Sequence, residues 1–95
     1  MALANNIPVF NEVTGGTIGL TTATLSGPTV SAQLARFCMS DAASTVTVNI
    51  GCDSAGVGGL EFTGGDAPVP FLVDNLNRIY MKASGNVTIN FTVER

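Results

Sequence analysis

Histidine is absent from this sequence, and its absence narrows the chemistry that the chain can perform. Histidine is the commonest general base in enzymes and the commonest metal ligand. Without it, neither a Ser–His–Asp nor a Cys–His catalytic site can be built. Seven carboxylates are present, but most are expected in turns, where aspartate caps the backbone. We therefore expect no catalytic residues, no cofactor and no enzymatic activity.

Positive charge is also scarce, and the net charge is −3. Nucleic-acid binding requires a basic stripe that displaces counterions from phosphate, and a polybasic membrane contact requires a similar cluster. No apolar run approaches the ~20 residues of a membrane span. We therefore expect neither nucleic acid nor membrane among the partners. The basic residues are scattered along the chain: Arg36, Arg78, Lys82 and Arg95.

Cysteine is limited to Cys38 and Cys52, whose spacing matches no zinc motif. A hairpin about a turn at residues 40–44 would place the two sulfurs several residue pairs apart, beyond the reach of a disulfide. Residues 1–8 lack the basic start and the long apolar run of a signal peptide. We therefore expect synthesis in a reducing cytoplasm, where both thiols stay free.

Three segments resemble ion or phosphate sites, but none has a sufficient set of ligands. Residues 52–56 and residues 64–66 each offer one carboxylate, whereas calcium takes six to eight oxygens. The glycine-rich residues 56–59 are not followed by the Gly-Lys-Ser/Thr of a phosphate loop. We interpret all three segments as turns or loops between strands and expect no metal site.

Strict alternation of apolar and polar side chains over residues 87–94 predicts a half-buried antiparallel strand. Residues 78–82 alternate as well, and residues 83–86 between them are a short loop of turn residues. We therefore expect a terminal hairpin. Residues 29–39 predict a strand less clearly, with a helix over Ser31–Met39 as the alternative. Gly15-Gly16 is expected to be a turn.

Further strands are predicted at residues 7–10, 18–25, 45–50, 60–62 and 69–73. Pro70 cannot donate to a ladder, so the last of these is expected at a sheet edge or at a bulge. About seven or eight short strands at spacings of roughly 8–12 residues predict an all-β fold, a small antiparallel sandwich or jelly-roll-like barrel. We expect one β domain at residues 13–95 and an N-terminal arm at residues 1–12.

Charged residues make up 12% of the chain, about half the usual ~25%. Threonine, serine, asparagine and glycine replace them, and the cores of protein–protein contacts are likewise depleted in charge. A β domain that is merely rich in threonine is the alternative. Ile7, Val9 and Phe10 in the arm are apolar, with no charge nearby before Glu12. We predict these three as assembly contacts.

Residues 73–89 contain the runs Leu-Asn-Arg-Ile-Tyr and Lys-Ala-Ser-Gly. This segment resembles the C-terminal hairpins of small all-β virion proteins of tailed bacteriophages. The composition is similar to that of head decoration, or cement, proteins, which are short, acidic, rich in threonine and glycine, and free of histidine and tryptophan. The resemblance implies a virion structural protein, made in the host cytoplasm, that binds the major capsid protein or another virion protein and stabilises the shell.

The few charges, the small size of the domain and the probable open strand edges predict a homo-oligomer, and a trimer is favoured because capsid lattices offer three-fold positions. The alternative function is a binding module, such as a fibre tip or a carbohydrate-binding domain. Sugar binding generally uses exposed aromatic side chains, but the sequence has no tryptophan and a single tyrosine, Tyr80. The phenylalanines are expected in the core.

Overall fold

The computed structural model describes residues 12–95 of the chain. Segments in which side chains alternate between two faces form eight strands there. The strands are β1 (Val13–Leu20), β2 (Leu25–Ser26), β3 (Leu34–Met39), β4 (Val48–Cys52), β5 (Leu60–Phe62), β6 (Val69–Leu72), β7 (Tyr80–Ala83) and β8 (Val87–Glu94). A short 3-10 turn, η2 (Leu76–Arg78), precedes β7. None of the described residues forms a helix long and apolar enough to cross a membrane.

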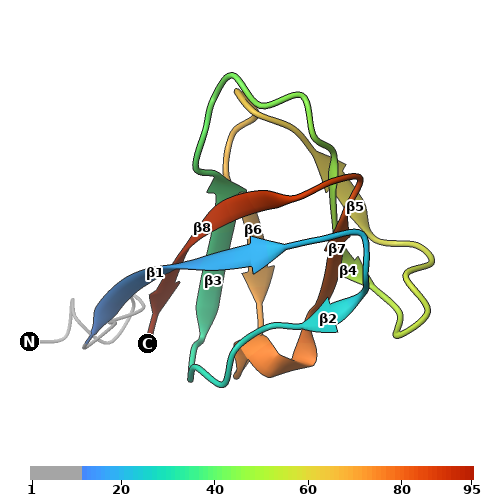
Figure 1. Cartoon of the computed structure of the whole chain (residues 1–95). Coiled ribbons are helices and arrows are strands. Elements are labelled where there is room, and N and C mark those ends of the chain that lie inside the picture. The colour runs from blue at the N-terminus through green and yellow to red at the C-terminus, as the bar shows by residue number, and fades with distance from the viewer. Residues whose placement is uncertain (1–11) are drawn as a thin grey trace, which may run out of the picture.

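The strands form two four-stranded antiparallel sheets that pack as a sandwich (Figure 1). One sheet, which we call sheet A, has the order β1-β8-β3-β6, and the other, sheet B, has the order β2-β7-β4-β5. The predicted all-β antiparallel sandwich of about eight strands is therefore confirmed. The strand predicted over residues 29–39 is confirmed for Leu34–Met39, which form β3, whereas residues 29–33 lie outside the strand and the alternative helix is wrong.

The predicted terminal hairpin is wrong, because β7 and β8 lie in different sheets. The loop between them crosses from sheet B to sheet A, and the N–H of Ser84 donates to the carbonyl of Thr47 at 2.9 Å. Met81 of β7 and Phe91 of β8 both face the core, but from opposite sides. Alternation predicts which side chains point inward, and it fits two facing strands as well as two paired ones.

The predicted turn at Gly15-Gly16 is also wrong, because β1 runs straight through it. Neither residue has a positive φ, so the backbone does not require glycine there. A Cβ on Gly16 would lie 2.7 Å from Cζ of Phe91 on the neighbouring strand, and glycine therefore makes room for that ring. Gly19 differs, since a Cβ there would meet nothing within 4 Å.

The core lies between the sheets and contains no buried polar or charged residue among those described. Phe37 is fully buried and packs edge-on against Phe71, with ring centroids 5.9 Å apart. Phe62 and Phe91 are also buried, whereas Phe71 is half-buried. The prediction that the phenylalanines belong to the core is confirmed for Phe37, Phe62 and Phe91, whereas Phe71 packs against the core from its margin and Phe10 lies outside the described residues.

Pro70 and Gly51 each affect the pairing of one strand. Pro70 lies on β6, which is an edge strand of sheet A as predicted. The N–H of Val73 donates to the carbonyl of Gln33 at 3.3 Å, so by alternation the nitrogen of Pro70 points away from β3. Gly51 does not end β4. It has a φ of 78° and interrupts the register between β4 and β7, so that Cys52 still belongs to the strand.

The predicted arm at residues 1–12 falls outside the described residues except for its last member. Glu12 exchanges two backbone hydrogen bonds with Arg95, at 2.9 and 3.0 Å, and its carboxylate accepts a hydrogen bond from Nε of Arg95 at 3.0 Å. These contacts extend the β1–β8 ladder by one pair. The predicted assembly contacts Ile7, Val9 and Phe10 lie outside the described residues.

Phe91→Ala should lower the free energy of unfolding by about 3–5 kcal/mol, because it empties space in the core. Thr92→Ala, on the opposite face of the same strand, should change stability by about 0.5 kcal/mol or less. Urea denaturation followed by circular dichroism measures both. Equal effects from the two variants would contradict the register of β8.

Gly19→Ala should raise the free energy of unfolding by about 0.4–1 kcal/mol, because alanine restricts the unfolded chain and meets nothing in the fold. Gly16→Ala should lower it, because the added Cβ would overlap the ring of Phe91. The same denaturation experiment measures both variants. A stabilising Gly16→Ala would contradict the packing of this ring on β1.

Candidate functional site

The outer face of sheet A gathers small uncharged side chains. Because successive strand residues point to opposite faces, the buried Ile89, Phe91 and Val93 of β8 leave threonine and asparagine on the outside. The register places these beside glycine and threonine of β1 and beside cysteine of β3. The central part of this face consists of Gly15, Thr17, Gly19, Cys38, Thr88, Asn90 and Thr92.

Charge on this face is restricted to one pair. Arg36 of β3 and Glu94 of β8 form a salt bridge of 3.1 Å across neighbouring strands. No other charged side chain of the four strands of sheet A appears among the described residues. Because the two charges neutralise each other, another protein can cover the face without burying an unpaired charge.

A strip of side chains that is apolar except for Glu94 lies on this face, at the end where β1 begins. The register aligns Val13, Glu94, Leu34 and Leu72 in one row across all four strands. Leu72 is 89% exposed and Val13 is 66% exposed, and exposed apolar side chains that gather in one place are typical of contact sites. Sequence analysis missed this strip because Leu34 and Leu72 become neighbours only through the pairing of β3 with β6.

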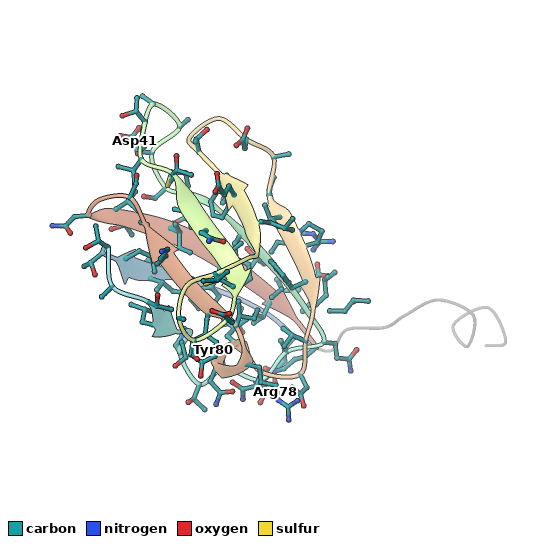
Figure 2. All side chains as sticks on the ribbon, turned by 90° about the vertical axis from the view of Figure 1, so that its right-hand side faces the viewer. Asp41, Arg78 and Tyr80 are labelled. Atoms are coloured by element: carbon teal, nitrogen blue, oxygen red, sulfur yellow. The ribbon has the colours of Figure 1, made fainter. Side chains whose placement is uncertain are left out.

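Charged side chains elsewhere lie largely in the loops and at the ends of the sandwich. Figure 2 shows Asp41 in a loop at one end and Arg78 near the opposite end. Arg78 forms an exposed salt bridge of 3.1 Å with Asp74. Asp41 accepts a hydrogen bond from the N–H of Ala43 at 2.9 Å. This distribution leaves the face of sheet A comparatively free of charge.

The loops considered for ions are turns held by their own aspartates, as predicted. Asp53 accepts hydrogen bonds from the N–H groups of Ala55 and Val57, both at 2.9 Å. Asp66 accepts one from the N–H of Thr63 at 2.8 Å. These carboxylate oxygens accept hydrogen bonds from backbone N–H groups and so stabilise the turns. Within residues 12–95, no three side chains of the metal-binding types come together.

Sheet B has a different outer face, with a polar hollow of about 540 Å³. The register aligns Glu61, Asn49 and Lys82 across β5, β4 and β7. Neither Glu61 nor Lys82 forms a salt bridge with another described residue. The hollow is lined by Thr47, Asn49, Gly56, Glu61, Lys82, Ala83 and Ser84, none of which is aromatic.

Asn49 contains the one buried side-chain polar atom that has no hydrogen-bond partner among the described residues. Its Nδ2 donates weakly to the carbonyl of Gly56 at 3.5 Å, while its Oδ1 lies beneath Gly59. A Cβ on Gly59 would be 2.5 Å from that oxygen. The glycine loop therefore covers the asparagine, and Oδ1 is buried and does not open toward the hollow.

Cys38 and Cys52 are both free thiols, as predicted. The hairpin used to predict this is wrong, because β3 and β4 lie in different sheets. Cys38 is half-buried and faces outward from sheet A, whereas Cys52 is buried. The two thiols are thus kept apart because they belong to different sheets of the sandwich.

Comparisons with protein-family models, with curated proteins and with solved structures give no match for this chain.

Cys38 should react with a thiol reagent in the folded protein, whereas Cys52 should react only as the protein unfolds, because its side chain is buried. A native and a denaturing titration with a chromogenic disulfide, both without reductant, would measure the two groups. Cys38→Ser identifies which thiol reacts first. Fewer than two thiols in the denatured protein would contradict the free state of both.

Proposed function

We propose that the chain is a virion structural protein of the capsid decoration type, which binds the head surface and stabilises the shell. The observation that carries this proposal is the outer face of sheet A, where the described residues leave no charge unpaired. The resemblance of residues 73–89 to small phage virion proteins supports the same class. The partner is the major capsid protein or another virion protein, and the location is the virion.

The chemistry of this face suits a broad contact made many times over. Covering Val13 and Leu72 would contribute about 1.5–3 kcal/mol each, before the costs of ordering the contact. Threonine and asparagine side chains would supply hydrogen bonds across the contact. Copies that are tethered to one another gain further affinity, because each later contact is made within one assembly. A shell is thereby stabilised without any single strong site.

The predicted arm would add to the same contact. β1 begins beside the apolar strip, since Val13 and Leu72 belong to one row of the register. Residues 1–11 precede this end of the sheet in the chain, so Ile7, Val9 and Phe10 are available for a contact near it. Their role in assembly, like the trimer expected from capsid lattices, is part of this proposal.

A binding module for a small polar ligand is the second candidate, because of the hollow on sheet B. Lys82, Glu61 and Ser84 could bond to sugar hydroxyls there. The lining has no aromatic side chain on which a sugar ring could stack. Tyr80 on β7 is 38% exposed but does not line the hollow. The face of sheet A therefore supports the decoration function better.

Co-sedimentation with purified phage heads that lack their outer proteins tests the proposed function. Asn90→Arg places an unpaired charge at the centre of the sheet A face and should weaken binding by about 10-fold or more. Asn86→Arg, the same change in an exposed loop, should leave binding unaltered. Circular dichroism should show that both variants fold.

Two results would contradict the proposal. If Asn90→Arg binds heads as tightly as the unaltered chain, the face of sheet A is not the contact. If the unaltered chain binds no head preparation but binds an oligosaccharide array, and Lys82→Ala removes that binding, the hollow on sheet B is the functional site.

A further inference from the structure

The four edge strands of the sandwich differ in how they are protected against pairing with another chain. β2 has two residues and β5 has three, so both are too short to serve as templates. β6 carries Pro70, whose nitrogen faces the free side of the strand. β1 has eight residues and neither proline nor charge. A long edge without such protection is a ready template for strand pairing.

Within residues 12–95, no strand pairs with the side of β1 that faces away from β8. Glu12 and Arg95 exchange both of their backbone hydrogen bonds, which fixes the alternation of the β1–β8 ladder. The residues of β1 that bond to β8 are Thr14, Gly16, Ile18 and Leu20. The N–H and C=O groups of the remaining residues point away from β8, and all of these residues are exposed: Val13, Gly15, Thr17 and Gly19.

Two of these exposed residues are glycines that the fold itself does not need. A Cβ on Gly19 would meet nothing within 4 Å, and one on Gly15 would meet only the carbonyl oxygen of Phe91, at 3.4 Å. Neither has a positive φ. Glycine inside a strand weakens it, and often marks a place where another backbone approaches closely. At Gly19 the described chain supplies no such backbone, and at Gly15 it supplies only that carbonyl oxygen of Phe91.

We propose that β1 pairs antiparallel with β1 of a second copy of this chain, about a two-fold axis at Thr17. Thr17 then lies opposite Thr17 of the second copy, and Gly15 lies opposite Gly19. On the core side, Gly16 lies opposite the larger Ile18. The outward N–H groups of Gly15, Thr17 and Gly19 each find a carbonyl, whereas Val13 would face Thr21, whose carbonyl already accepts from the N–H of Ala83. The two hydroxyl side chains form a favourable cross-strand pair, and no like charges meet. Such a contact uses the same patch on both partners.

The pairing joins two sheets of the order β1-β8-β3-β6 into one continuous sheet of twice that width. It uses the edge of β1 and leaves the outer face of sheet A open. The inference therefore does not depend on head binding, and a failure of one leaves the other standing, except that a dimer would replace the trimer of the proposed function. A two-fold axis differs from the three-fold expected from capsid lattices, so the mass of the assembly separates the two.

The test is made on the full chain in solution, by sedimentation equilibrium and by NMR-detected amide hydrogen exchange. We expect a dimer, with twice the chain mass of 9.7 kDa. The amides of Gly15, Thr17 and Gly19 should exchange about 100-fold more slowly than amides in open loops, because they are bonded across the axis. In a monomer, only the amides that bond to β8 would be protected.

Matched variants locate the contact. Thr17→Lys puts two ammonium groups opposite each other and should weaken dimerisation by about 10-fold or more. Thr88→Lys adds the same charge to the same face on β8, one strand away from the edge, and should leave the dimer unaltered. Thr17→Pro removes the central donor without removing a bond to β8, and should give a folded monomer.

Each other outcome overturns the proposal. A monomer at high concentration, or a dimer whose odd-numbered β1 amides exchange rapidly, would show that the edge is not the contact. A trimer with slow exchange at Thr17 would show that a strand other than the β1 of a two-fold mate occupies the edge. A dimer that Thr17→Lys, Thr17→Pro and Thr88→Lys all leave intact would also rule out the pairing.

Discussion

The position of β8 in the middle of sheet A is the constraint on which the rest of the sandwich depends. It bonds to β1 on one side and to β3 on the other, so its alternation sets the register of both neighbours. A slip by one residue would exchange Ile89, Phe91 and Val93 for threonine and asparagine in the core. The outer face, with its single ion pair, and the buried inner face of sheet A are therefore two consequences of one pattern.

The same pattern links the core to the surface proposed for assembly. Phe91 fills the space that Gly16 leaves open, and the extended strand this permits continues past the ring as a long edge. With no charge between Glu12 and Arg36 in the sequence, neither β1 nor the segment after it has the charges that usually protect an edge. The scarcity of charge in the composition is thus also found at a particular site in the structure, the edge formed by β1.

Sequence patterns predicted the positions of the strands better than they predicted which strands pair with one another. The strands at residues 60–62, 69–73 and 87–94 and the edge position of Pro70 were predictable, because alternation and proline act locally. The partners of β7 and β8 were not, since alternation is blind to which sheet a strand joins. The role of Gly16 depends on Phe91, which is distant in sequence. For the same reason, composition predicted an uncharged contact surface, but only the β3–β6 register places Leu34 beside Leu72.

The closure of sheet A by residues far apart in sequence has a consequence during synthesis. Glu12 and Arg95, which meet at its margin, are separated by 83 positions. While a ribosome is making the chain, β1 and β3 emerge long before β8 and have no strand between them. The sheet forms only once residue 94 has left the exit tunnel, and such non-local pairing is slow. Nascent chains crowded on one messenger would therefore expose matching β1 segments to one another before each has acquired its own β8.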